Sequence, residues 1–216
     1  MNRPQAQATT KDNDGTMIEL SGYLIAFEGL DQSGKQPQAE RLLAALRQSG
    51  RQAHFLSFPD YDTAIGTEIG RALRGSRDYA ADVMQLLYIA NRYEYRRSIE
   101  QWLADGAVVV CDRYLASSVA YGEAQGLDAS WLTATQMYLP AAAVTLLLDI
   151  APDASLARKQ LDRDRYEQDL HLLARVRESY LRQAAQPHWV RLDGGQAKDA
   201  VTEAVFTTVR SRLGLL

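Results

Sequence analysis

The amino-acid sequence predicts an α/β fold in which a parallel sheet of five strands is covered by helices on both faces. Five short runs rich in aliphatic and β-branched residues recur along the chain, and stretches with helical spacing lie between them. Each run is continuously apolar, as expected for a strand that is buried on both faces of a sheet. Strands that alternate with helices form parallel sheets with right-handed crossovers.

The predicted elements alternate from Tyr23 to near the end of the chain. Strands are expected at residues 23–28, 53–58, 107–112, 143–150 and 188–193. Helices are expected at residues 35–49, 79–104, 114–139, 153–186 and 196–213. Ligands of such sheets bind beyond the carboxyl ends of the strands. Functional residues are therefore expected just after Glu28, Phe58, Asp112 and Asp149.

Length and composition are those of a folded globular protein. The chain has 216 residues, 46% of them hydrophobic and 24% charged, which is close to the average for globular domains. The N-terminal stretch is polar, so residues 1–20 are expected to form a flexible tail. No internal repeat or linker divides the remainder. Residues 21–216 are therefore expected to form a single domain.

Charge and cysteine content exclude several classes of function. A net charge of −3 is too balanced for a surface that coats nucleic acid or binds a membrane through basic residues. No run approaches the ~18 apolar residues of a membrane-spanning helix. Cys111 is the single cysteine, so no disulfide framework is possible and a reducing, cytoplasmic compartment is expected. The sequence predicts a soluble protein without nucleic-acid or membrane partners.

A glycine-rich loop follows the first predicted strand. Residues 29–36 read GLDQSGKQ, in the pattern G-x-x-x-x-G-K, and precede an amphipathic helix. Glycines let successive backbone N–H groups turn toward a phosphate, the helix N-terminus adds positive potential, and Lys35 supplies a mobile positive charge. The residues expected to contact the phosphates of a nucleotide are Gly29, Leu30, Asp31, Gln32, Ser33, Gly34, Lys35 and Gln36.

The residues that follow the lysine depart from the usual pattern. The next position is normally Ser or Thr, whose hydroxyl binds Mg²⁺, whereas this chain has Gln36 and then Pro37. Proline is tolerated in the first helical turn because those N–H groups have no partner within the helix. We expect the loop to keep its shape, and the rate of phosphoryl transfer to be affected more than nucleotide binding.

A carboxylate ends another predicted strand. In VVVCDRY, Asp112 follows a buried run and is placed to bind Mg²⁺ directly or through water, with Arg113 next to it. A structural Asp–Arg ion pair is the alternative interpretation.

Five blocks of sequence together resemble the thymidylate kinase family. They are GLDQSGK (29–35), FPDY (58–61), LLYIANR (86–92), DRYLASSVAY (112–121) and DRYEQDLHLLARVRESY (164–180). They occur in the order of that family and at roughly its spacing, and the resemblance covers about residues 22–213. Each block alone is a weak to moderate signal, whereas the ordered set is specific.

The resemblance implies a fold and a reaction. The fold would be the nucleoside monophosphate kinase version of the P-loop NTPase fold, with a short arginine-rich lid. The reaction would transfer the γ-phosphoryl group of ATP to dTMP, giving dTDP and ADP with Mg²⁺ as the metal. The partners would be ATP, dTMP and a second copy of the chain in a homodimer.

The resemblance also implies roles for single residues around dTMP. Asp31 would lie near the acceptor sugar and the metal, and Arg113 would bind the acceptor phosphate. Tyr88 would stack on thymine and Arg92 would reach a carbonyl of the base. These two residues are four positions apart, so they share one helix face. On spacing alone, a core aromatic beside a surface charge is the alternative interpretation, and the ordered blocks favour the binding role.

The remaining positions of the dTMP site follow from two of the blocks. Phe58 and Tyr61 match a branch of the family that has FPxY where other members have an arginine. Ser117 and Ser118 would provide a small polar group near the base. Tyr121 would lie over the sugar and disfavour a ribose.

An arginine-rich segment at about residues 157–167 would form the lid. Its candidate cations are Arg158, Arg163 and Arg165, and a solvated charged helix face is the alternative interpretation. Glu167 would join Asp31 and Asp112 as a metal ligand. The residues implied in catalysis are Lys35, Asp31, Arg113, Arg163 and Arg165.

Two other functions remain open at this point. One is a kinase of another nucleotide or deoxynucleoside, because the choice of base depends on few contacts. The other is a protein that binds nucleotide without competent transfer, and the replacement of Ser or Thr by Gln36 and Pro37 is its support. Turnover measured across nucleoside monophosphates separates these functions.

Overall fold

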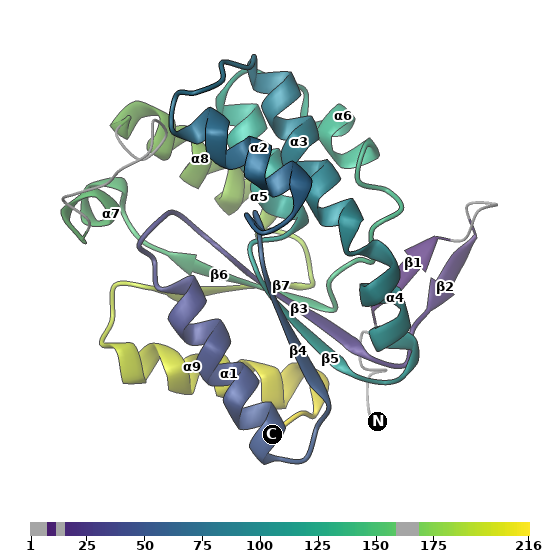
Figure 1. The fold of residues 1–216 in the computed structure, drawn as a ribbon. Coiled ribbons are helices and arrows are strands. Elements are labelled where there is room, and N and C mark those ends of the chain that lie inside the picture. Colours follow the sequence, from purple (N-terminus) through teal and green to yellow (C-terminus); the bar gives the residue numbers. More distant parts are fainter. Residues whose placement is uncertain (1–7, 12–15, 159–168) are drawn as a thin grey trace.

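The computed structural model describes residues 8–11, 16–158 and 169–216. Its central feature is a five-stranded, all-parallel sheet in the order β4-β5-β3-β6-β7 (Figure 1). The strands are β3 (Tyr23–Glu28), β4 (Ala53–Ser57), β5 (Val108–Asp112), β6 (Val144–Asp149) and β7 (Trp189–Asp193). Each predicted strand is confirmed, with ends that differ by at most one residue.

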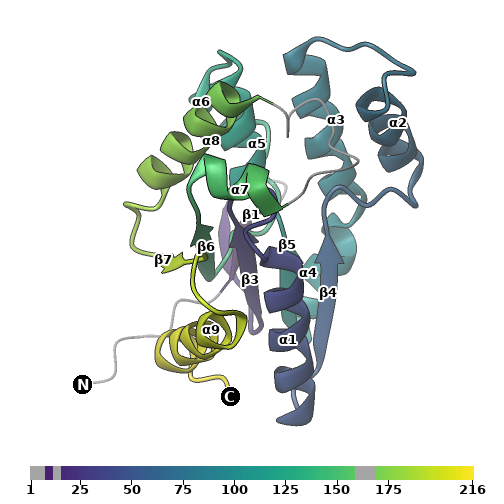
Figure 2. The ribbon, with the colours of Figure 1, turned by 90° about the vertical axis from the view of Figure 1, so that its left-hand side faces the viewer.

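Helices cover both faces of the sheet, as predicted. On one face lie α1 (Lys35–Gln48) and α9 (Lys198–Leu213) (Figure 2). The other described helices are α2 (Ala64–Leu73), α3 (Ala81–Glu94), α4 (Arg96–Ala104), α5 (Leu115–Ala124), α6 (Ala129–Ala134), α7 (Pro152–Arg158) and α8 (Leu170–Gln183).

The longer predicted helices are shorter in the structure. The stretch 79–104 is divided into α3 and α4, and the stretch 114–139 into α5 and α6. The second break has a local cause, because Gly126 takes the left-handed conformation (φ 89°) and Asp128 then caps α6 through the backbone N–H of Trp131. Helix α2 lies in a region for which no helix was predicted.

Alternate residues of the central strands fill two different cores. Ile25 and Phe27 of β3 pack with α1 and α9, whereas Leu24 and Ala26 face α4 on the other side. All four side chains are at most 1% exposed. This burial on both faces explains why the strand sequences are continuously apolar.

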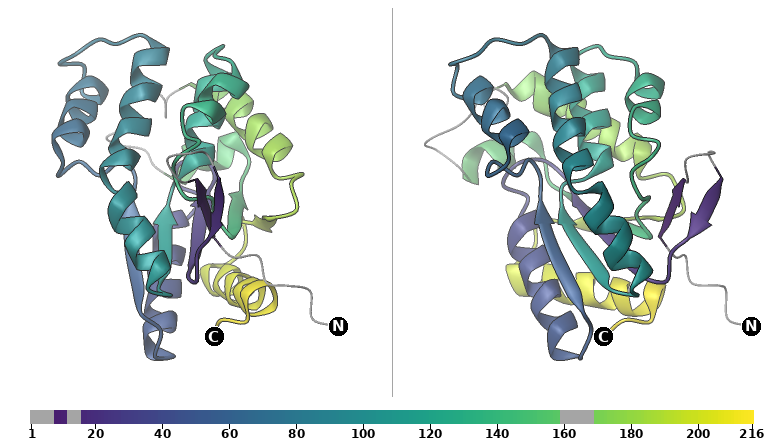
Figure 3. Two further views of the ribbon diagram at one scale, coloured as in Figure 1. Left: turned by 90° about the vertical axis from the view of Figure 1, so that its right-hand side faces the viewer. Right: turned by 45° about the vertical axis from the view of Figure 1, so that its right-hand side comes forward.

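The N-terminal segment corrects the expectation of a flexible tail over residues 1–20. Its described residues form a two-stranded antiparallel sheet of β1 (Thr9–Lys11) and β2 (Met17–Glu19). Thr9 bridges to Ala141, and Thr10 donates a hydrogen bond to Glu100 of α4 (Oγ1–Oε1 3.0 Å), beside which the sheet lies in Figure 3. Ala8 is fully buried. The segment is polar, but its backbone pairs and a few apolar side chains attach it to the domain.

The carboxyl ends of the strands point toward two groups of helices. Figure 2 shows α2 and α3 on one side and α5, α6 and α8 on the other above this edge of the sheet. Helices α3 and α5 are in contact, through the hydrogen bond from Arg92 to Ser118 (2.7 Å). In the described ranges no helix is both long and apolar enough to cross a membrane.

Candidate active site at the carboxyl edge of the sheet

The glycine-rich loop connects β3 to α1 through unusual backbone conformations. Gly29, Gln32 and Gly34 have φ angles of 140°, 60° and 92°. At Gly29 a Cβ atom would lie 2.5 Å from the carbonyl oxygen of Leu148. Glycine is therefore required there both by the backbone angle and by the close approach to β6.

Lys35 is the first residue of α1, and its side chain is folded against the loop. The residue is 6% exposed, and its Nζ donates a hydrogen bond to the carbonyl oxygen of Leu30 (2.7 Å). Burial and the nearby Arg113 guanidinium lower the pKa of Lys35 to about 8, against the opposing attraction of Asp31. Near pH 8, part of the Lys35 population is therefore neutral. A phosphate beside the Lys35 side chain would favour its protonated, positively charged form.

The replacement of the usual hydroxyl leaves the local backbone intact, as predicted. Helix α1 begins at Lys35 and runs through Pro37 in its first turn. The Gln36 side chain donates a hydrogen bond to Glu40 one turn later (Nε2–Oε1 2.9 Å), on the exposed surface of the helix. The Gln36 side chain therefore forms a hydrogen bond within α1, to Glu40, in this structure.

Asp31 is held in an ion pair beside the loop. Its Oδ1 accepts from Arg113 (2.5 Å) and its Oδ2 accepts from the Tyr121 hydroxyl (2.9 Å). Burial raises the pKa of this carboxyl, but Arg113 and Lys35 outweigh that effect and hold the pKa at about 2. Asp31 is a carboxylate at every physiological pH.

Arg113 takes a strained backbone conformation between β5 and α5. Its φ angle is 63°, in the left-handed region that non-glycine residues rarely adopt. The guanidinium lies 5.4 Å from the centre of the Tyr121 ring. Strain of this kind persists only where surrounding contacts fix the chain.

A buried carboxylate provides those contacts. Glu28 is fully buried at the end of β3, and it accepts hydrogen bonds from the backbone N–H groups of Tyr114 (2.8 Å) and Ser117 (3.3 Å). Its other oxygen accepts from the hydroxyls of Ser117 (2.6 Å) and Tyr180 (3.0 Å). Glu28 therefore joins β3, the start of α5 and α8, and fixes the segment that follows Arg113.

A cavity beside the loop brings together every residue that the resemblance implied for dTMP. The lining residues from that set are Asp31, Phe58, Tyr61, Tyr88, Arg92, Arg113, Ser117, Ser118 and Tyr121. They come from β–α loops and from helices α3 and α5, far apart in sequence. The structure thus places them around one space next to the phosphate loop.

Arg92 is buried in the wall of this cavity. It is 2% exposed, and its Nη1 donates to Ser118 Oγ (2.7 Å) and to the carbonyl oxygen of Tyr88 (3.3 Å). Burial lowers the pKa of Arg92, and the negative charge of Glu28 opposes this effect. The guanidinium is held in one place by these bonds.

Three lining residues were not among the predicted site residues. They are Pro59, Leu73 and Gln85. Pro59 lies inside the block FPDY, and Gln85 is three and seven residues before Tyr88 and Arg92, which puts all three on one face of α3. The helical period could therefore have identified Gln85. Leu73, at the end of α2, carries no such signal.

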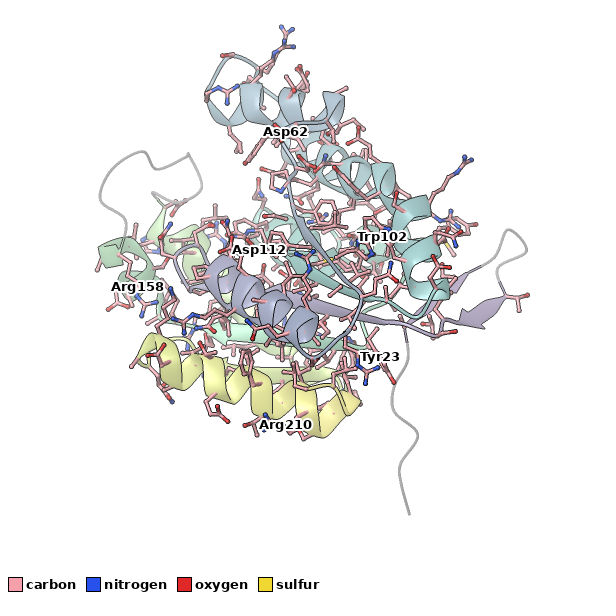
Figure 4. The ribbon with its side chains drawn as sticks, turned by 60° about the horizontal axis from the view of Figure 1, so that its bottom comes forward. Tyr23, Asp62, Trp102, Asp112, Arg158 and Arg210 are labelled. Carbon is pink, nitrogen blue, oxygen red and sulfur yellow. The ribbon has the colours of Figure 1, made fainter. Side chains whose placement is uncertain are left out.

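Helix α7 packs against the phosphate loop. Ser155 donates a hydrogen bond to the carbonyl oxygen of Asp31 (2.7 Å), and Arg158 donates to that of Gln32 (3.0 Å). Figure 4 labels Arg158 at the edge of the molecule and Asp112 further inside. Of the predicted lid residues, Arg163, Arg165 and Glu167 lie outside the described residues.

Asp112 fits the chemistry of a magnesium ligand. It is 8% exposed, and its Oδ1 has no hydrogen-bond partner among the described residues. From the residues that the structure describes, its Oδ2 accepts a single long bond, from Ser57 (3.4 Å). A buried carboxylate oxygen that accepts no hydrogen bond is energetically unfavourable, and coordination of a hard cation such as Mg²⁺ would stabilise it. Both oxygens of Asp31, by contrast, already accept hydrogen bonds.

These features define a protein of the P-loop NTPase class. The loop and the start of α1 have the geometry that suits the phosphates of a nucleotide, and the cavity beside the loop has two cations, Arg92 and Arg113, in its wall. The parallel sheet places the loop and the cavity at the same edge.

Comparison with known proteins identifies the family. Residues 27–205 match the sequence profile of thymidylate kinases. A thymidylate kinase of Arabidopsis thaliana is 37% identical over 150 residues, which are 69% of this chain and 57% of that protein. The Plasmodium falciparum enzyme is 32% identical over 80% of this chain and 82% of its own length. The structure of the Candida albicans enzyme matches with a TM-score of 0.79 at 29% identity, covering 88% of this chain and 92% of that one.

The chain belongs to the thymidylate kinase family. It is a nucleoside monophosphate kinase that phosphorylates dTMP to dTDP.

Proposed function

We propose that dTMP binds in the cavity between α3 and α5, and that ATP binds with its phosphates in the loop between β3 and α1. The observation that supports this placement is that residues from four separate sequence blocks line one cavity beside the loop. Tyr88 stacks on the base, Arg92 donates to a base carbonyl, and Ser118 contacts the base next to it. Tyr121 lies over the sugar.

Charge supports the position of the acceptor phosphate. Arg113 is the cation of the cavity nearest the loop, and a guanidinium can bind a phosphate through two parallel hydrogen bonds. Its present partner is Asp31 (2.5 Å). When the acceptor phosphate binds Arg113, Asp31 is partly released toward the sugar hydroxyl. Phe58 and Tyr61 complete the wall, and the Tyr61 hydroxyl offers a neutral donor to the same phosphate.

The chain's own groups perform transfer mainly by positioning and by neutralising charge. Lys35 and the backbone N–H groups of residues 29–36 bind the phosphates of ATP. Mg²⁺, when bound, neutralises charge on the transferred group, and Asp112 is the ligand that fits it best, with Asp31 and Glu167 as further candidates. Arg158, Arg163 and Arg165 of the lid add positive charge and exclude water.

Assembly and location are part of the same proposal. We infer one domain that includes the N-terminal strands β1 and β2, with a lid at about 157–167, acting as a homodimer in the cytoplasm. Large apolar side chains that are exposed on α3 and α6 favour a partner surface there: Val83 (38%), Leu86 (43%) and Trp131 (36%). Light scattering after size exclusion measures the mass. A monomeric mass at micromolar concentration contradicts the dimer.

Turnover tests the proposed roles. ADP release coupled to a spectroscopic assay is expected to be highest with dTMP and lower with dUMP, and equal turnover of AMP, CMP or GMP contradicts the placement of the base. Lys35→Ala is expected to lower turnover at least about a hundredfold in a folded protein, the usual effect of removing a contact to transition-state charge. Normal turnover by this variant contradicts the role of the loop.

A further inference from the structure

Gln85 is buried in the wall of the acceptor cavity with its amide unsatisfied. The residue is 1% exposed, and it lines the cavity together with Tyr88 and Arg92. Neither its Oε1 nor its Nε2 has a hydrogen-bond partner among the described residues. It packs closely against α5, where a Cβ atom on Gly122 would lie 3.3 Å from its Cγ.

Burying the Gln85 amide without hydrogen-bond partners destabilises the protein unless a ligand supplies those partners. An unpaired buried polar group costs on the order of 1–3 kcal/mol, and Gln85 has two such atoms. Gln38, a glutamine buried to a similar degree, has both amide atoms paired, through the carbonyl oxygen of Lys198 (2.8 Å) and the hydroxyl of Thr202 (2.8 Å). Gln136, a third buried glutamine, has its Nε2 paired with the carbonyl oxygens of Leu115 (3.2 Å) and Leu132 (3.0 Å) and only its Oε1 unpaired in the described part of the chain. Among the described buried glutamines, Gln85 therefore differs in having both amide atoms unpaired.

Arg92, on the same face of α3, restricts the kind of ligand that can hydrogen bond to the Gln85 amide. Arg92 also has a buried atom without a partner in the described part of the chain, its Nε. A guanidinium only donates hydrogen bonds, whereas an amide both donates and accepts. Both residues line the cavity, and their unpaired groups are two donors and one acceptor. The complementary ligand edge has carbonyl oxygens on either side of an N–H group.

We propose that Gln85 is a specificity-determining residue whose amide hydrogen bonds to the imide edge of the acceptor base. Its Nε2 donates to a ring carbonyl and its Oε1 accepts from the ring N–H. This extends the proposed placement of the base in the cavity, on which it depends. A 4-amino pyrimidine presents a donor where the 4-oxo base presents an acceptor, so it leaves donors of the wall unpaired.

Gln85→Glu tests the proposal with almost no change of shape. It replaces the amide donor by an acceptor, which repels a ring carbonyl and suits an amino group. We expect the ratio of kcat/KM for dTMP to that for dCMP to fall at least tenfold, chiefly through KM for dTMP, with KM for ATP unchanged. Dissociation constants of dTMP and dCMP from calorimetry give the same ratio where turnover of dCMP is too slow to measure.

Two further variants keep the test decisive. Gln85→Met removes both hydrogen bonds at similar volume and is expected to raise KM for dTMP about tenfold or more. Gln136→Met is the matched control, because Gln136 is a buried glutamine outside this cavity, and it is expected to leave both the KM and the ratio unchanged. Thermal unfolding identifies any variant that fails to fold.

The outcomes distinguish the role of Gln85 from the proposed binding of the base in this cavity. If Arg92→Ala raises KM for dTMP but Gln85→Glu and Gln85→Met leave KM and the dTMP-to-dCMP ratio unchanged, the base binds here and Gln85 does not read it. If none of these variants affects dTMP, the base does not bind in this cavity and both proposals fail. A parallel loss of activity toward dTMP and dCMP in both Gln85 variants indicates a structural role and also overturns the inference.

Discussion

The burial of Lys35 makes nucleotide binding a proton-linked event. The pKa of this ammonium is lowered to about 8 in the protein without ligand. A phosphate placed against it adds negative charge within hydrogen-bond reach, and the charged form then becomes strongly favoured. Lys35 must therefore take up a proton when ATP binds to a molecule in which it was neutral.

The size of the effect follows from the pKa. At pH 7 about a tenth of the molecules have a neutral Lys35, at pH 8 about half, and at pH 9 about nine tenths. ATP binding is expected to take up the corresponding fractions of a proton. If only the charged form binds phosphate well, the affinity falls about tenfold between pH 7 and pH 9. Because the pKa of the Lys35 ammonium is lowered to about 8, the affinity for ATP is lost as the pH rises through 8.

Calorimetry measures this uptake directly. A non-hydrolysable ATP analogue with Mg²⁺ is titrated at pH 8.5 in buffers of different ionisation enthalpy, and the slope of the observed enthalpy gives the protons bound. The phosphates of the analogue ionise near pH 6 and contribute little at pH 8.5. Lys35→Arg is the matched control, since a guanidinium stays protonated throughout this range.

The measured proton uptake either supports or refutes the lowered pKa of Lys35. The expected outcome is uptake of more than half a proton by the wild type at pH 8.5, on the order set by the lowered pKa, and close to none by Lys35→Arg. Equal uptake by the two proteins, with an affinity that stays flat between pH 7 and pH 9, would refute the reasoning. It would mean that Lys35 is charged before the nucleotide arrives, or that it does not contact the phosphates.

Other predictions concern single sites. Gln36→Ser with Pro37→Thr restores the missing hydroxyl, so kcat is expected to rise and the half-saturating Mg²⁺ concentration to fall; superimposable curves for the two proteins reject the idea that the loop is impaired. Arg92→Ala is expected to raise KM for dTMP at least tenfold and to leave that for ATP unchanged, because one substrate alone loses a contact; an equal rise for ATP places Arg92 elsewhere. Glu28→Ala leaves several buried donors unpaired and is expected to lower the free energy of unfolding by about 3 kcal/mol, measured by urea titration; a loss below about 1 kcal/mol contradicts its anchoring role. Cys111 is buried and its pKa is raised by burial, so a thiol reagent at pH 8 is expected to react only after unfolding, and rapid labelling of the folded protein would show otherwise.

The strands and the loop could be predicted because their signals are local. A strand buried on both faces has a continuous apolar run, and Gly29, Gly34 and Lys35 mark the loop within seven residues. The site could be predicted less directly. Spacing alone places Tyr88 and Arg92 on one helix face, and only the resemblance to a family connected them with residues of α5.

The parts that were missed depend on contacts between distant residues. The unpaired amide of Gln85 becomes visible once α3 and α5 are packed together, because the sequence does not tell which buried polar groups find partners. The N-terminal strands have three residues each, too few for a clear periodic signal, and one of them bridges to Ala141. The break between α5 and α6 depends partly on a single glycine, Gly126, whose backbone angle cannot be predicted from helical spacing.

The attachment of the N-terminal strands has a consequence for the order in which the molecule is completed during synthesis. The backbone N–H of Ala141 donates to the carbonyl oxygen of Thr9 (2.7 Å), yet Ala141 is translated more than a hundred residues later. At the usual rate of translation this delay is on the order of ten seconds. The N-terminal strands leave the ribosome before Ala141, so they can attach to the domain only after the segment that contains Ala141 has been synthesised.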